Sequence, residues 1–534
     1  MTLAIIDVTL RSIINRTSMN RIFGRQILIT FILLSLLSPL TGSSVNPKRE
    51  MRGVWLATVW GIDWPSVTGN SHDIRRRQMI EMAALLDRCE AMNLTTVFFQ
   101  VRCMGDVMYK SQLEPWSSFV SGTRGVSPGW DPLKFVVEEC HRRGLECYAW
   151  VNPFRWSSGT DYDSAPDRKW KEKGWLLTYG KYTVFNPGLD EVRQHVVDIC
   201  REIVSGYEVD GLVFDDYFYP NKIPEDSTVG DYCLWQAQAP WMSFGDWRRA
   251  NVHKTIADVH SMISDLRPEV RFGISPAGVA ARSRTSASKW GSEPVEVKAD
   301  DWQYAEIYSD PLGWLYQGTV DFISPQIYWP TTHETAPYEP LASWWSGVSN
   351  DYGCHLYNSM TLAPLDKRNT LAERGELLRQ IDTNRSTGIG GYNGTVLYSA
   401  KFIHKLAPDL MKAHFKGKSL SPELRHAMSV ADDDREIASP EDLRLKGHLL
   451  QWGSGDTGTS RGEAVCHPRR YVVYAFPSNL SKDEVMDENG DGVKGEYLFR
   501  VVYGTELNVP KGHFNFAVTS LSGYSIESAP IFLK

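Results

Sequence analysis

The stretch VDGLVFDDYFYP, residues 209–220, determines how the rest of the chain is interpreted. Its short apolar run, residues 212–214, follows Gly211 and precedes turn-forming residues, which is typical of a buried strand. The run ends on two adjacent carboxylates, Asp215 and Asp216, and aromatic residues follow at once. One interpretation is an acidic turn that caps the next helix. The other is the end of a strand at an active site, and the neighbouring segments favour it.

Three further segments have the same organisation. Residues 94–102, 145–155 and 320–330 each begin with an apolar run and end on polar or aromatic side chains. The side chains at these ends are Gln100 and Arg102 with Asp106 just beyond, Asn152 and Arg155, and Gln326, Tyr328 and Trp329. In a (β/α)8 barrel the active site lies at the C-terminal ends of the parallel strands. The segments together therefore predict a TIM-type α/β barrel whose mouth carries these side chains.

The remaining apolar runs complete the predicted barrel. Further strands are predicted near residues 53–60, 271–276, 355–360 and 394–398, and helices over residues 74–92, 132–143, 191–205, 246–266 and 372–384. Long loops follow the strands, whereas the connections from helix back to strand are short. Because strand-to-helix loops carry the function on this scaffold, the asymmetry independently favours a barrel.

After residue 415 the composition changes. Residues 416–440 are rich in Ser, Pro and charge, which predicts a boundary. Short alternating runs follow at residues 445–452, 470–476, 497–502, 513–519 and 524–532. These runs predict a small all-β sandwich of the fibronectin or immunoglobulin kind. We therefore expect three parts: a signal peptide at residues 1–44, the barrel at residues 45–415 and the sandwich at residues 416–534.

The N-terminal segment predicts export. Arg21 and Arg25 precede an uncharged apolar run, residues 27–40, and the small residues 41–44. That order is typical of a secretory signal peptide. A retained membrane anchor is the alternative, although the run is shorter than the ~20 residues that a span needs. No other segment could span a bilayer, so we expect a periplasmic or cell-surface protein.

Composition excludes several classes of protein. Residues 1–44 carry four Arg and one Asp, so the remainder has a formal net charge of −10, against −7 for the whole chain. An acidic chain without clustered Lys and Arg argues against a nucleic-acid partner. The eight cysteines are scattered and show no metal-type spacing. Their pattern therefore supports neither a zinc site nor a disulfide framework. Residues 487–492 resemble a calcium loop, but Leu498 stands where an acid is needed, so a hairpin turn is predicted.

The motifs resemble a known family. The matching runs include RGVWLAT at 52–58, FQVR at 99–102, AWVNPFR at 149–155, FDDYFYP at 214–220 and SPQIYW at 324–329. Their order over residues 52–399 is similar to that of glycosyl-hydrolase-like family ten, exported barrels linked to bacterial cell-wall glycan. The resemblance implies a glycoside hydrolase of peptidoglycan strands, including strands already stripped of peptide, with a C-terminal fibronectin-like module. The chain departs from the family pattern at Cys103, where Pro is expected, and in residues 310–314.

Glycosidic cleavage needs two carboxyl groups. Asp215 is the first candidate for the nucleophile or base. Side chains alternate along a strand, and its position in that alternation allows its side chain to point into the barrel mouth. Asp216 is a candidate for the acid, since two close carboxylates disfavour each other's ionisation. Asp310, in its Tyr-Ser-Asp context, is another candidate for the acid. Substrate binding by hydrogen bonds or ring stacking is expected of Arg102, Asp106, Asn152, Tyr217, Gln326, Tyr328 and Trp329.

Three functions remain open on these grounds, each with a glycan as partner. They are a hydrolase of cell-wall glycan, a glycan-binding protein without turnover, and a hydrolase of a dietary or host polysaccharide. Adjacent acids at a strand end favour hydrolysis, because binding alone does not need them. No catalytic-triad motif, phosphate loop or metal-ligand cluster occurs, so we expect neither a cofactor nor a metal.

Overall fold

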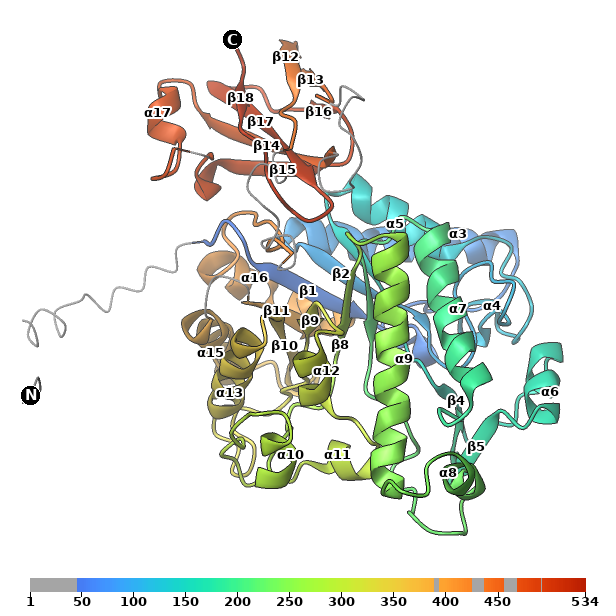
Figure 1. The fold of residues 1–534 in the computed structure, drawn as a ribbon. Coiled ribbons are helices and arrows are strands. Elements are labelled where there is room, and N and C mark those ends of the chain that lie inside the picture. The colour runs from blue at the N-terminus through green and yellow to red at the C-terminus, as the bar shows by residue number, and fades with distance from the viewer. Residues whose placement is uncertain (1–45, 389–392, 425–436, 456–467, 491) are drawn as a thin grey trace, which may run out of the picture. The chain divides into compact units, whose positions relative to one another are not determined.

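Eight parallel strands close into a barrel in the order β1-β11-β10-β9-β8-β7-β3-β2 (Figure 1). The computed structural model describes residues 46–388, 393–424, 437–455, 468–490 and 492–534, so the predicted signal peptide lies outside it. The barrel strands are β1 (Met51–Leu56), β2 (Thr96–Arg102), β3 (Glu146–Val151), β7 (Gly211–Phe214), β8 (Arg271–Ile274), β9 (Phe322–Ile323), β10 (His355–Thr361) and β11 (Asn393–Tyr398). Each corresponds to a predicted strand, which confirms the TIM-type barrel.

A helix follows each barrel strand in the chain. These helices are α3 (His72–Ala91), α5 (Pro132–Arg142), α7 (Asp190–Gly206), α9 (Phe244–Leu266), α12 (Pro311–Gln317), α13 (Tyr338–Asp351), α15 (Leu371–Thr387) and α16 (Ile403–Ala413). Side-chain caps define several starts: the Ser71 hydroxyl accepts a bond from the amide of Ile74 at α3, and Thr370 with Glu373 forms a capping box at α15. Over the described ranges, none of the helices has the length and apolarity to cross a bilayer.

The loop after β3 contains secondary structure that the sequence did not predict. Strands β4 (Arg155–Ser158), β5 (Leu176–Tyr179) and β6 (Tyr182–Phe185) form an antiparallel sheet in the order β4-β6-β5, and α6 (Ala165–Glu172) connects β4 to β5. Because β4 begins only a few residues after β3 ends, this sheet starts beside the barrel mouth. It therefore brings its first residue, Arg155, to the strand ends.

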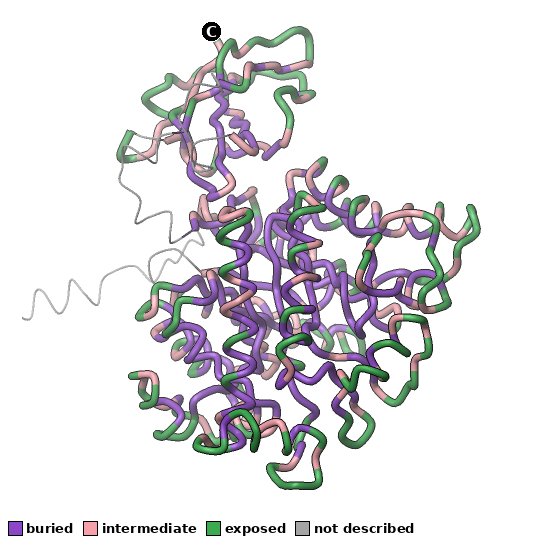
Figure 2. Tube along the Cα trace, turned by 45° about the vertical axis from the view of Figure 1, so that its right-hand side comes forward, coloured by how far each residue is buried: buried purple, intermediate pink, exposed green. Residues whose placement is uncertain are grey.

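Aromatic rings fill the inside of the barrel. Most of the barrel is drawn in purple, the colour of buried residues, in Figure 2. Glycines on neighbouring strands leave room for these rings. A Cβ atom added to Gly53, Gly211 or Gly273 would lie 2.7, 2.6 or 2.5 Å from a ring atom. The rings concerned belong to Phe98, Tyr148 and Phe322 respectively. The interior is thus a packed core that supports the strand ends, as expected of this fold.

The C-terminal part is all-β and antiparallel, as predicted. One sheet has the order β12-β13-β16 and the other β15-β14-β17-β18. The strands are β12 (Glu441–Lys446), β13 (Leu449–Gly453), β14 (Pro468–Pro477), β15 (Leu498–Val502), β16 (Glu506–Asn508), β17 (Phe514–Ser522) and β18 (Ile531–Phe532). The predicted single run at 445–452 is instead a hairpin, because Gly447 adopts a left-handed φ of 64° and reverses the chain. Membership of the fibronectin or immunoglobulin class stays a prediction.

Replacing Gly211 by Ala tests the packing of the barrel interior. The added methyl group would force the ring of Tyr148 to move, and overpacking of this kind costs about 1–3 kcal/mol. We expect the Gly211→Ala variant to lose that much free energy of unfolding in chemical denaturation. The matched control is Gly347→Ala within α13, where no atom lies within 4 Å of the new Cβ and the free energy should rise by about 0.5–1 kcal/mol. Equal free energies of unfolding of the two variants would contradict the close packing of Gly211 against the Tyr148 ring.

Candidate active site

A cavity of about 190 Å³ lies at the C-terminal ends of the barrel strands. It is lined by Trp55, Val59, Trp60, Ile62, Gln100, Trp150, Arg155, Asp215, Tyr217, Ser275, Gln326, Tyr328 and Tyr398. These residues come from the ends of β1, β2, β3, β7 and β11, from β4, and from the loops after β1, β7, β8 and β9. One carboxylate, that of Asp215, is among them.

Asp215 directly follows β7 and is buried with its side chain toward the cavity. The indole Nε1 of Trp150 donates to its Oδ2 at 3.1 Å, while its buried Oδ1 accepts no hydrogen bond from any described residue. Burial, and next the negative charge of Asp216, raise the pKa of Asp215 to about 7. The charge of Arg155 and the Trp150 hydrogen bond oppose that rise. Asp215 is therefore about half protonated at pH 7 and can serve as a proton donor there.

Asp216 is buried next to Asp215 in the chain but is not among the residues that line the cavity. Burial raises its pKa to about 6, against the opposing effects of its backbone hydrogen bond, the Arg155 charge and a bond from Gln326. Its own charge is the largest cause of the raised pKa of Tyr217, about 12, and Tyr217 lines the cavity. Adjacent carboxyl groups that titrate near neutral pH are suited to acid and base roles.

The structure brings only some of the predicted site residues to this cavity. Asp215, Tyr217, Gln326 and Tyr328 line it, and Asp216 adjoins it. Asn152 does not line the cavity but supports a residue that does. Its Oδ1 accepts a hydrogen bond from the backbone N–H of Arg155 at 3.0 Å, which shapes the turn after β3.

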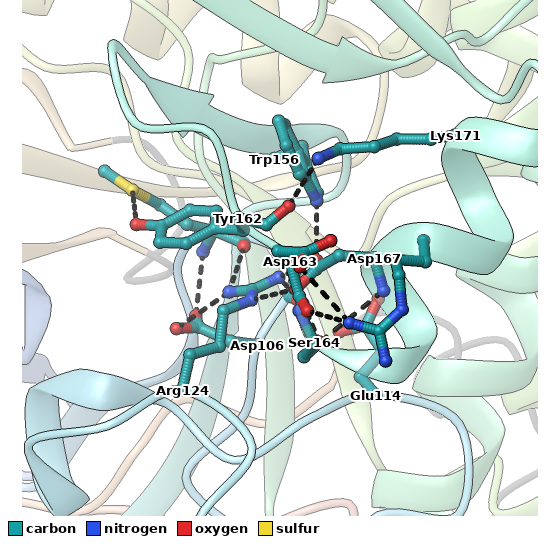
Figure 3. A network of polar contacts seen from close by, with 12 residues as sticks. Asp106, Glu114, Arg124, Trp156, Tyr162, Asp163, Ser164, Asp167 and Lys171 are labelled. Atoms are coloured by element: carbon teal, nitrogen blue, oxygen red, sulfur yellow. Dashed lines mark hydrogen bonds and ion pairs between the residues drawn. The ribbon is translucent and has the colours of Figure 1, made fainter.

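Arg102 and Asp106 are paired within the protein. Arg102 donates to Glu114 at 2.7 Å (Nε to Oε2) and 2.6 Å (Nη2 to Oε1), with both side chains buried. Figure 3 shows Asp106 in a polar network around Arg124, whose guanidinium lies 3.2 Å from Asp106 and 2.8 Å from Asp167. Arg102 and Asp106 do not line the cavity. Their ion pairs instead hold the loop after β2 and the segments next to it.

Asp310 and Trp329 also lie outside the cavity lining. Asp310 precedes α12, and its Oδ2 accepts from the Trp290 indole at 2.9 Å and lies 3.3 Å from Nε2 of His253 on α9. Trp329 packs against the main core and tilts against His333, with ring centroids 6.1 Å apart. In the described residues, no cluster of three or more His, Cys, Asp or Glu side chains could hold a metal ion.

Sequence reasoning missed several residues of the lining. Trp150 stands in the AWVNPFR run that was singled out and shares the strand phase of Asn152, so a signal was present. Arg155 was expected at the mouth but was not among the predicted site residues. Trp55 belongs to the core and also lines the cavity. Tyr398 ends β11, whose C-terminal end was not considered.

Trp60 is presented on a rigid loop. It is 62% exposed and adopts φ 53°, a left-handed conformation that is strained for a bulky residue. Two side-chain acceptors, the partly buried Asp63 and the buried Gln100, hold the loop around it. Asp63 accepts the amide of Ala57 at 2.7 Å, and Gln100 Oε1 accepts the amide of Val59 at 2.9 Å. An exposed ring on a strained backbone adds little to the free energy of unfolding. At the cavity rim, such a ring is suited to stacking on a sugar.

The chain is similar to proteins described as glycosyl hydrolases. The sequence model of the glycosyl hydrolase-like 10 family matches residues 50–370. Glycosyl hydrolase DigH of Escherichia coli K12 is 34% identical over 402 residues, which cover 70% of this chain and 89% of that protein. Glycosyl hydrolase YngK of Bacillus subtilis 168 is 34% identical over 375 residues, 68% of this chain and 70% of that protein.

Among solved structures, the chain matches the PgaB (BpsB) glycoside hydrolase domain from Bordetella bronchiseptica. The match covers 70% of this chain and 100% of that one, with 13% identity and a TM-score of 0.44.

Replacing Trp60 by Gly separates ligand stacking from stability. Glycine adopts a positive φ without strain, so the free energy of unfolding should stay level or rise. Loss of the ring should weaken calorimetric binding of a cell-wall oligosaccharide by about 3- to 10-fold. Trp241→Ala is the control, because Trp241 is 80% exposed and does not line the cavity. Unchanged affinity of the Trp60→Gly variant, or a loss of stability instead, would contradict this role.

Proposed function

The chain belongs to the glycosyl hydrolase-like 10 family, and on that premise we propose that it cleaves O-glycosidic bonds of bacterial cell-wall glycan. It is a glycoside hydrolase, and the glycan strands of peptidoglycan, including peptide-free strands, are the proposed substrate. The observation that carries the proposal is the pair of adjacent buried carboxyl groups, Asp215 and Asp216, with raised pKa values at the barrel mouth. A protein that only binds glycan does not need two buried acids there.

The electrostatic setting supports a division of roles, because the charge of Asp216 adds to burial in raising the pKa of Asp215. Asp215, with a pKa of about 7, is the proton donor to the leaving oxygen, and Asp216, with a pKa of about 6, is the ionised partner. This reverses the order expected from strand phase alone, in which Asp215 was the nucleophile or base. Trp150 orients Asp215 through its indole N–H, and Gln326 restrains Asp216.

The cell-wall assignment has separate support. The motifs in residues 52–399 resemble exported barrels linked to cell-wall glycan, and residues 1–44 have the features of a signal peptide. We propose a periplasmic or cell-surface enzyme with its catalytic barrel in residues 45–415. Residues 416–534 are proposed as an accessory fibronectin-like module. The exposed rings of Trp60 and Tyr217 at the mouth are suited to stacking on sugar residues.

Product analysis with matched aspartate variants tests the proposal. The protein, Asp215→Asn and Asp310→Asn are incubated with peptidoglycan, peptide-free glycan and neutral polysaccharides, and the products are identified by mass spectrometry. We expect muramic-acid-containing oligosaccharides from the parent, and a loss of about 10²–10⁴-fold in rate for Asp215→Asn. Asp310→Asn should retain activity, because the Asp310 carboxylate is bonded to Trp290 and lies beside His253, and neither of these residues lines the cavity.

The pH profile provides a second readout of the same variants. The parent's kcat/KM should fall below about pH 6, where Asp216 becomes protonated, and above about pH 7, where Asp215 loses its proton. Equal glycan binding by parent and Asp215→Asn without product would favour a glycan-binding protein. Release of neutral oligosaccharides alone would favour a hydrolase of another polysaccharide. Loss of activity in Asp310→Asn alone would move the acid role to Asp310.

A further inference from the structure

Arg155 separates two cavities. It lines the 190 Å³ cavity that holds Asp215 and also a second cavity of about 90 Å³. Tyr217 lines both as well, and the Arg155 guanidinium carbon lies 3.4 Å from the centroid of the Tyr217 ring. The two side chains thus form a stacked partition between the candidate catalytic cavity and its neighbour.

Arg155 differs from the other arginines near this end of the barrel. Each of those is neutralised by a carboxylate, in the pairs Arg102–Glu114, Arg124–Asp167 and Arg248–Asp231. Arg155 forms no ion pair with any carboxylate in the described part of the chain, although its charge lowers the pKa of Asp215 and Asp216. It is half-buried, so part of its charge is already removed from water. An unpaired, half-buried guanidinium at a cavity wall is suited to an anionic ligand.

The second cavity is compatible with a negatively charged sugar. No Asp or Glu lines it, and Tyr182, Thr183, Asn221 and Trp302 provide hydroxyl, amide and ring groups. Asp215 is the one acid among the residues that line the first cavity, and Asp216 lies next to it in the chain. Without Arg155, an anionic substrate would meet only like charge.

We propose that Arg155 binds the free carboxylate of an acidic sugar next to the scissile bond. This inference rests on the proposed function and names the group recognised: the lactyl carboxylate of a muramic acid residue. The planar guanidinium can donate two parallel N–H bonds to a carboxylate. When a peptide is attached, the same carbonyl carbon is an amide without charge, so Arg155 selects glycan strands from which the peptide has been removed.

Paired substrates test this selection. The substrates are oligosaccharides of alternating N-acetylglucosamine and N-acetylmuramic acid with free carboxylates, and the same oligosaccharides with every carboxyl group converted to a methylamide. We expect the full-length protein to show a kcat/KM at least about 10-fold higher for the free-carboxylate form. Arg155→Gln should bring the ratio close to one, and Arg155→Lys should give an intermediate ratio, because Lys keeps the charge but loses the fork. The ratio is informative because an altered pKa of Asp215 affects both substrates equally.

The control variant is Lys222→Gln, which removes a 73% exposed cation that follows Asn221 but does not line either cavity. It should keep the parent ratio. Calorimetric binding of both oligosaccharides to Asp215→Asn gives the same comparison without turnover. Equal kcat/KM and equal Kd for the two forms would overturn the role of Arg155 while leaving the hydrolase proposal intact. Absence of hydrolysis of either form, together with preferential binding of the free carboxylate that Arg155→Gln abolishes, would retain the carboxylate site and overturn the hydrolase proposal.

Discussion

Burial of two adjacent carboxyl groups at the end of β7 is the constraint on which the proposed chemistry depends. A carboxylate removed from water loses its hydration, and a second negative charge beside it adds repulsion. The pKa of Asp215 rises from its usual 3.8 to about 7, which corresponds to about 4 kcal/mol in favour of the protonated form. The protein tolerates this cost because the surrounding barrel holds the two acids in place. The same cost keeps a proton available at neutral pH.

The rest of the barrel can be understood as support for that pair. Rings from several strands fill the interior, and glycines on adjacent strands give them room, so the strand ends cannot collapse inward. The loop after β1 is clamped by Asp63 and Gln100, and the loop after β2 by the Arg102–Glu114 pair. Because these polar side chains are bonded within the protein, they are not available to bind substrate. Arg155, at the mouth, forms no ion pair with any carboxylate among the residues that the structure describes.

The strands were predictable because each is an apolar run that ends at a polar or aromatic residue, as in residues 212–216. Their closure into one barrel follows from the alternation with helices. The sheet of β4, β5 and β6 was not predicted, because its strands are short and alternate weakly between apolar and polar residues. Helix α13 was missed because its sequence includes Pro340 and Gly347, which weaken the helical pattern.

The candidate site was partly predictable for a different reason. Position at a strand end identified Asp215, Tyr217, Gln326 and Tyr328, but it also selected Arg102, whose partner Glu114 lies in the following loop. Sequence position cannot distinguish a side chain that is neutralised internally from one that is free for a ligand. The exposure of Trp60 depends on a backbone φ of 53°, which no sequence pattern indicates. The acidity of Asp215 depends on burial, which only the folded barrel provides.

Infrared difference spectroscopy of the carboxyl C=O stretch tests the central claim most directly. Subtracting the spectrum of Asp215→Asn from that of the parent isolates the Asp215 carboxyl group, which is then titrated with pH. A protonated-carboxyl band that disappears with a midpoint near pH 7, and at a lower pH in Asp216→Asn, is the predicted result. A midpoint near the ordinary value of about 4 would contradict the account, because Asp215 would then be ionised at neutral pH and unable to donate a proton.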